Sequence, residues 1–73
     1  MGGWRRLVRL SVIVNLDTGR SFEGVLWSSA GGLLTLKNAA MLEAGREAVP
    51  VDGEVVVDRA RVEFLQVLEG RRS

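Results

Sequence analysis

The chain has 73 residues and a mass of 8.0 kDa, which is room for a single small domain. Ten Lys and Arg residues against nine Asp and Glu residues give a net charge of +1, which excludes a polyanion-coating tail and a strongly acidic disordered chain. The absence of Cys and His excludes disulfides, thiolate chemistry, imidazole catalysis and nearly every structural zinc site. Without disulfides or metal, a core this small gives marginal stability, so we expect self-association.

The first element is a strand. Apolar and polar residues alternate over residues 8–16, and this period of two predicts a β-strand there. Trp4, Leu7 and Val8 have helical spacing, so a short helical turn before the strand stays open. Residues 17–20 combine Asp with Gly and predict a turn.

Two further strands follow. Residues 20–27 place Phe22 on one face and Trp27 on the other, and Gly24 within them marks a bend or a close approach of two backbones. Ser, Ala and Gly residues at 28–32 predict a turn, and residues 33–42 then predict the third strand.

The next segment contains loop signals. Gly45, Pro50 and the Asp-Gly pair at 52–53 predict a loop or a distorted hairpin over residues 43–53, in which valines extend the flanking strands. The segment from 54 to 68 is the most apolar of the chain, and its polar break at 58–61 divides it into two strands.

The valine run at 55–57 breaks strict alternation, so both faces of that strand need cover. A terminal strand of one small sheet cannot bury both of its faces alone. We therefore expect a second copy of the chain to cover it, and the alternative is a core strand of a monomer.

Five short strands with tight connections predict a mostly β fold, a small and strongly bent antiparallel barrel or sandwich. We expect one domain over residues 1–73, with its core at about 8–68 and a flexible tail at 69–73.

The order of these signals resembles the Sm-like family, which comprises the Sm, Lsm and Hfq proteins. Residues 12–26 are similar to the first Sm motif, 33–39 to its third strand and 54–65 to the second motif, so the resemblance spans about 8–67. It implies a five-stranded SH3-like or OB-like barrel capped by an N-terminal helix. It also implies a ring, in which the fourth strand of one copy pairs with the fifth strand of the next.

The uridine pocket of the family is degenerate in this sequence. Where the resemblance implies an Asp and an Asn between strands two and three, the chain has Ser29 and Leu33, given a one-residue deletion. Asp58 and Arg59 stand where an Arg-Gly pair is expected. A leucine side chain cannot hydrogen-bond a base edge, so the resemblance implies an atypical mode of RNA binding.

Arg59 and Arg61 lie in the turn that would line the pore of a ring. Repeated around the ring, they would form a positive girdle that holds phosphates. The alternative is that they pair with Asp58, with Glu63 or with a carboxylate of the neighbouring copy.

A second basic cluster lies at the N-terminus. Aromatic side chains interleaved with arginines stack on bases and contact phosphates, so this cluster is a candidate for nucleic-acid binding. Its members are Trp4, Arg5, Arg6 and Arg9. The alternative is a solvated turn whose Trp packs on the barrel. Trp27 is either an exposed stacking platform or a residue that closes the barrel or an interface.

The sequence predicts a non-catalytic, cytoplasmic protein without metal, cofactor or membrane partner. We expect a homo-oligomeric ring of five to seven copies that binds single-stranded RNA. The alternative function is a structural or protein-interaction ring component, phage or bacterial, without RNA binding. The candidate interface residues are Val55, Val56, Val57, Val62, Phe64 and Leu65.

Overall fold

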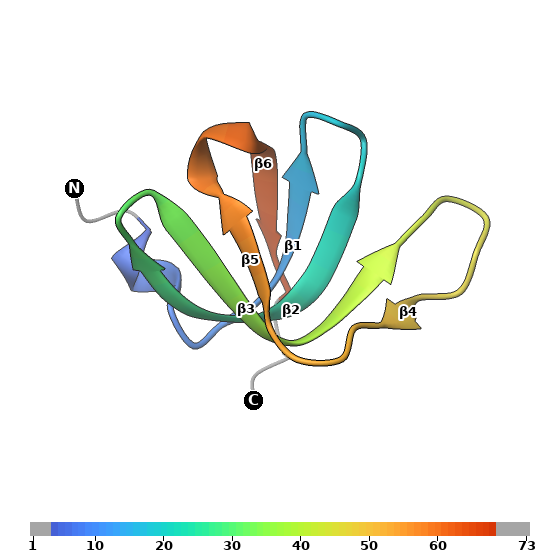
Figure 1. Cartoon of the computed structure of the whole chain (residues 1–73), viewed down its shortest axis with the longest axis horizontal. Coiled ribbons are helices and arrows are strands. Elements are labelled where there is room, and N and C mark those ends of the chain that lie inside the picture. Colours follow the sequence, from blue (N-terminus) through green and yellow to red (C-terminus); the bar gives the residue numbers. More distant parts are fainter. Residues whose placement is uncertain (1–3, 69–73) are drawn as a thin grey trace.

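The computed structural model describes residues 4–68 and contains one antiparallel sheet of six strands that bends strongly around a small core (Figure 1). The tail predicted at 69–73 lies outside the described residues. The elements in chain order are the 3-10 helix η1 (Arg5–Leu7), β1 (Ser11–Leu16), β2 (Ser21–Ala30), β3 (Leu33–Leu42), β4 (Val49–Pro50), β5 (Val55–Asp58), the 3-10 helix η2 (Arg59–Arg61) and β6 (Val62–Val67).

The N-terminal turn is helical but short, and the strand after it starts later than predicted. The helix η1 has three residues. Arg9 has a φ of 81°, which is left-handed and incompatible with a strand. Its backbone N–H donates to the carbonyl of Leu26 at 2.6 Å, so the chain turns there and enters β1 at Ser11. The prediction of a strand from residue 8 is therefore wrong for its first three residues.

The pair formed by β2 and β3 is the longest of the sheet, with ten residues in each strand. Residues 28–30, predicted as a turn, continue β2, and the chain reverses at Gly31 and Gly32, whose φ angles are 61° and 80°. Two adjacent glycines reverse the chain without a longer loop because they tolerate positive φ. The prediction of a five-residue turn is therefore wrong, and the loop between the second and third strands is much shorter.

Gly24 allows the bend of β2, as predicted. A side-chain carbon at this position would lie 3.0 Å from the carbonyl oxygen of Lys37 and 3.2 Å from the Cα of Ala39. The register between β2 and β3 shifts at this point. The two backbones therefore approach so closely that only glycine fits without movement.

Both β4 and β5 pair with β3, on the edge that β2 does not occupy. The segment predicted as a loop or distorted hairpin contains the short strand β4. Its residues Val49 and Pro50 pair with Met41 and Ala40 of β3. This strand raises the number of strands from the expected five to six. The fourth and fifth strands of the family resemblance correspond to β5 and β6.

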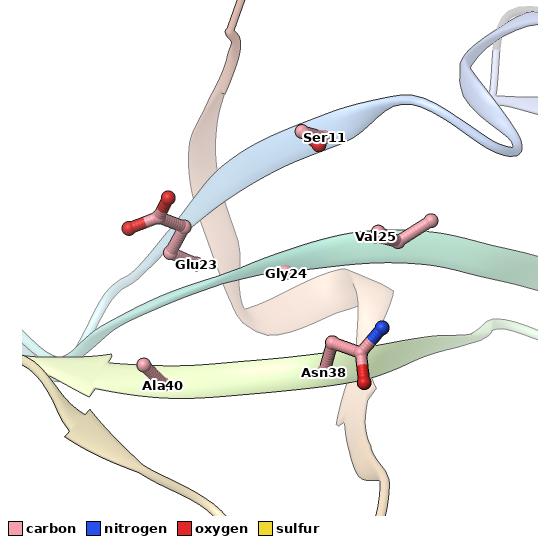
Figure 2. A pocket seen from close by; sticks show the side chains of 6 residues that line it. All are labelled: Ser11, Glu23, Gly24, Val25, Asn38 and Ala40. Atoms are coloured by element: carbon pink, nitrogen blue, oxygen red, sulfur yellow. The ribbon is translucent and has the colours of Figure 1, made fainter. Parts of the chain in front are cut away.

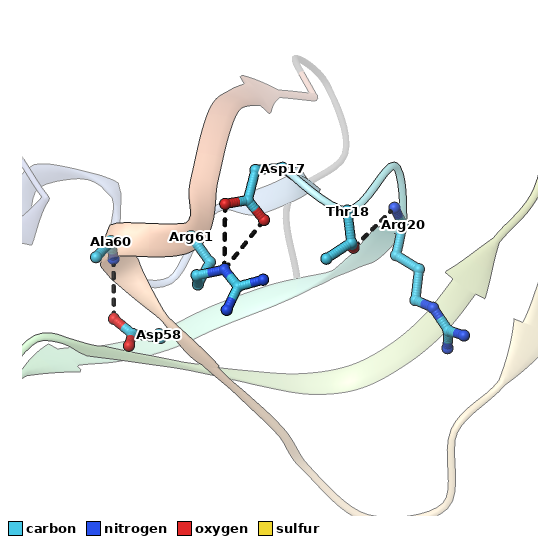
Figure 3. Close-up of polar contacts among 6 residues, drawn as sticks. All are labelled: Asp17, Thr18, Arg20, Asp58, Ala60 and Arg61. Carbon is cyan, nitrogen blue, oxygen red and sulfur yellow. Dashed lines mark hydrogen bonds and ion pairs between the residues drawn. The ribbon is translucent and has the colours of Figure 1, made fainter.

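The polar break between β5 and β6 is the 3-10 helix η2. The side chain of Asp58 accepts a hydrogen bond from the backbone N–H of Ala60 at 3.0 Å, which caps the helix (Figure 3). The chain then returns as β6, which pairs with β1.

The core lies inside the bend of the sheet, and its side chains come from β1, β2, β3 and β5. Trp4 and Leu7 from the N-terminal segment pack against it. Its fully buried members are Val12, Val14, Leu26, Leu34 and Leu36. The alternation of buried and half-buried positions along β1 matches the period of two from which this strand was predicted.

Candidate nucleic-acid interface

Arg59 and Trp4, predicted as members of two separate basic clusters, lie together. The Arg59 guanidinium carbon is 5.9 Å from the centroid of the Trp4 ring. This is at the outer limit of a cation–π contact, about 6 Å. The backbone N–H of Arg59 donates to the carbonyl of Gly32 at 2.8 Å. The start of η2 is therefore fixed against the β2–β3 turn, and the N-terminal segment lies beside it.

The positions that the resemblance connects with uridine recognition lie close to Arg59. Leu33 pairs with Asp58 across β3 and β5, and 47% of its surface is exposed. Ser29 lies within β2, half-buried and paired with Leu34, rather than in a loop. Leu33 and Asp58 therefore share the outer face beside Arg59, whereas Ser29 is in register with the buried Leu34 and lies on the opposite face of the sheet.

Arg61, unlike Arg59, forms an ion pair with an acidic residue of another turn. Its Nε lies 3.1 Å from both carboxylate oxygens of Asp17, and the backbone N–H of Asp17 donates to the Arg61 carbonyl at 2.8 Å (Figure 3). Of the alternatives considered for Arg61, pairing within the chain is observed, but with Asp17 rather than with Asp58 or Glu63. This ion pair offsets the charge of Arg61, so Arg59 is the cation of η2 that remains for a ligand.

The N-terminal basic cluster divides into two parts. Arg5 and Arg6 lie in η1 and are exposed. Arg9 lies over Trp27 instead, with its guanidinium carbon 4.3 Å from the ring centroid. Lys37 approaches the same ring, with its Nζ also 4.3 Å from the centroid.

Trp27 is therefore not an open stacking platform. The residue as a whole is 38% exposed, and cations from two other segments lie against its ring. It faces away from the core because the adjacent Leu26 is fully buried. The contact of Lys37 with this ring was not predicted from the sequence, although its place on the strand paired with β2 was a usable signal.

The edges of β5 and β6 form a second surface of interest. Within residues 4–68, β5 pairs only with β3 and β6 only with β1, so each has an unpaired edge. Val56 and Phe64 on these strands are 55% and 53% exposed. Val57 belongs to the core of its own chain, and the remaining candidate interface residues pack against that core: Val55, Val62 and Leu65.

The described part of the chain shows no group of three or more His, Cys, Asp or Glu residues placed to hold a metal ion. Nor does any helix within residues 4–68 have the length and hydropathy needed to cross a membrane. What the geometry offers is an aromatic ring, a guanidinium and hydrogen-bonding groups at one side of a small barrel.

No protein-family model matches the chain, and no curated protein matches it. Solved structures do match. One is the Sm protein of Pyrococcus abyssii in complex with a uridine heptamer, with a TM-score of 0.76 and 26% sequence identity. The match covers 88% of this chain and 90% of that one. This likeness over nearly the whole length shows that the chain has the fold of an Sm protein, and it supports the resemblance to the Sm-like family.

Proposed function

We propose that the protein is a homo-oligomeric Sm-like ring that binds single-stranded RNA without catalysing a reaction. The structural neighbour is an Sm protein in complex with a uridine heptamer, and this supports RNA as the ligand class. The observation that carries the proposal is the contact between Arg59 and Trp4 beside the β2–β3 turn.

The physical basis is a shared site for a base and its phosphate. A base stacks on an aromatic ring or on a guanidinium plane, and an arginine contacts phosphate oxygens. Arg59 and Trp4 supply both kinds of contact. Arg5 and Arg6 add positive charge next to Trp4.

Ring assembly follows from the open edges of β5 and β6. Backbone groups on an unpaired edge favour pairing with another strand, and head-to-tail pairing closes into a ring when the rotation fits. Val56 and Phe64 would be covered by this pairing, which explains why the valine-rich strand is apolar on its exposed side. Five to seven copies would then repeat the Arg59 site, and one RNA strand would contact several of them.

Binding of oligo-U, oligo-A and mixed-sequence RNA tests this function at about 50 and 200 mM salt, since phosphate contacts weaken with salt. Arg59→Ala should reduce the affinity and flatten the salt dependence. The matched control is Arg46→Ala, because Arg46 is exposed in the loop before β4 and pairs with the nearby Glu43. Equal affinities of the two variants would contradict the role of Arg59.

A second function, a structural or protein-interaction ring, is favoured by two observations. Asp17 offsets the charge of Arg61, and Leu33 is exposed at the position where a base-reading side chain is expected. If the protein has the mass of a ring and binds none of the three RNAs at about 50 mM salt, this function replaces RNA binding.

A further inference from the structure

Leu33 is an apolar side chain on the surface beside the Arg59 site. It is the first residue of β3, pairs with Asp58 of β5 and is 47% exposed in the single chain. The carbonyl of the preceding residue, Gly32, accepts the backbone hydrogen bond of Arg59 at 2.8 Å. Leu33 is therefore held next to the start of η2, the segment that carries Arg59.

The side chains next to Arg59 are poorly suited to tell one base edge from another. The two turn glycines, Leu33 and Ala60 have no polar side-chain atom. The Asp58 carboxylate accepts a hydrogen bond from the backbone N–H of Ala60, and as an acceptor it can bond to the N–H group of any base. Each base has such a group on its pairing edge, uracil at N3 and adenine at its N6 amine. A carboxylate at this place therefore does not select among the bases.

The neutral polar side chains of β3 lie farther along the strand. Thr35, two residues from Leu33 on the same face, has a hydroxyl, which both donates and accepts and therefore bonds to either kind of edge. The amide of β3 belongs to Asn38 near the middle of the strand, about 16 Å from Leu33 in an extended chain. Figure 2 shows this side chain at a pocket lined by residues of β1, β2 and β3. Asn38 is therefore too far away to read a base that stacks on Arg59.

We propose that the Arg59 site selects a base by the area that it stacks rather than by its edge, and that it therefore prefers adenine to uracil. An amide at position 33 would present a donor and an acceptor side by side, which matches the adjacent N–H and carbonyl groups of uracil. Leucine supplies neither group. Selection by stacking rests on the proposed RNA function and adds which base the site takes.

The planar groups of the site then decide the order of affinities. The Arg59 guanidinium carbon lies 5.9 Å from the centroid of the Trp4 ring, and both groups bind the flat face of a base. Adenine has two fused rings and uracil has one, so adenine covers more of a planar group and removes more apolar surface from water. The exposed Leu33 adds apolar surface beside Arg59. Adenine should therefore bind about fivefold tighter than uracil, which corresponds to about 1 kcal/mol.

Two RNA heptamers that differ in one base test this selection. One contains only uridine, and the other has a single adenosine at its centre, so that adenines do not stack on each other in the free RNA. Binding is followed by the fluorescence anisotropy of a 5′ label at about 50 mM salt, where phosphate contacts are strong. The heptamer with adenosine should bind about fivefold tighter. Equal affinities, or tighter binding of the uridine heptamer, would overturn selection by stacking.

Leu33→Asn tests the residue to which the absence of edge recognition is assigned. The variant supplies an amide at an exposed position, so it should bind the uridine heptamer severalfold tighter and lose the preference for adenosine. The matched control is Val49→Asn, because Val49 is 52% exposed on β4. This control should leave both affinities unchanged. If Leu33→Asn has the same ratio of affinities as the wild-type protein, the role of Leu33 is wrong.

Arg59→Lys separates stacking from charge. Lysine keeps the positive charge but has no planar group, so the salt dependence should stay while the preference for adenosine decreases. An undiminished preference would contradict stacking on Arg59.

The failure of base selection is distinguishable from the failure of RNA binding. If both heptamers bind equally and both lose affinity in Arg59→Ala, selection by stacking is wrong and the RNA function stands. If neither heptamer binds at about 50 mM salt, the RNA function and the selection are both wrong.

Discussion

The Nε of Arg61 lies 3.1 Å from each carboxylate oxygen of Asp17, so the helix η2 is tied to the turn between β1 and β2. Both side chains are about half exposed, at 56% and 51%. An exposed pair of this kind contributes at most about 1 kcal/mol to the free energy of unfolding. Its main effect is therefore on the charge available to a ligand.

Asp17→Asn should strengthen RNA binding. The variant removes the carboxylate and frees the guanidinium of Arg61 on the same turn as Arg59. One additional phosphate contact makes the slope of log affinity against log salt more negative by about 0.7 for a single strand. Glu43→Gln is the control, since it removes a carboxylate from the pair with Arg46. An affinity that rises equally in both variants would indicate a general charge effect.

Two neighbouring leucines on β3 should differ sharply in their effect on stability. Leu34 is fully buried, and Leu34→Ala should lower the free energy of unfolding by about 2–5 kcal/mol through lost burial and a cavity. Leu33 is 47% exposed in the single chain, and Leu33→Ala should cost much less. Urea unfolding followed by circular dichroism measures the stability of both variants. Similar unfolding midpoints would contradict the placement of Leu34 in the core and of Leu33 at the surface.

Gly24→Ala should destabilise the protein by about 1–3 kcal/mol, because the added carbon would meet backbone atoms that cannot move away easily. The contact is the carbonyl oxygen of Lys37 at 3.0 Å. Ser28→Ala is the matched control on the same strand, at an exposed position. An unchanged unfolding midpoint for the glycine variant would show that β2 and β3 are farther apart at this bend.

A charge on the open edge should prevent assembly without unfolding the chain. Val56 is 55% exposed on β5, and Val56→Lys would place an ammonium where the neighbouring copy would pack. Val49→Lys is the matched control, since Val49 is 52% exposed on β4. Light scattering should give a lower mass for the first variant only. The same mass for both would move the interface away from β5.

Much of this fold could be predicted from the sequence, because its signals are local. Alternation identified β1, the apolar stretches on either side of the polar break at 58–61 identified β5 and β6, and Gly24 marked the close approach that the structure confirms. The residues whose structure was not predicted correctly take that structure from contacts with residues that lie far away in the sequence. Residues 28–30 extend β2 because β3 continues opposite them, although their composition is typical of a turn.

The candidate site was less predictable for the same reason. Arg59 and Trp4 lie far apart in the sequence, and 44 positions separate Arg61 from Asp17. The sequence suggested each arginine as a ligand for RNA but not which of them would meet a carboxylate. Arg9 was grouped with Trp4 by proximity in the chain, and only the left-handed turn shows that it belongs to the outer face.

Native mass spectrometry of the protein with an oligo-U RNA shows in one experiment whether the chain forms a ring and whether that ring binds RNA. We expect a mass of five to seven times the 8.0 kDa chain, with RNA bound to that assembly and lost on Arg59→Ala. A single species at 8.0 kDa that takes up no RNA at low salt would contradict it.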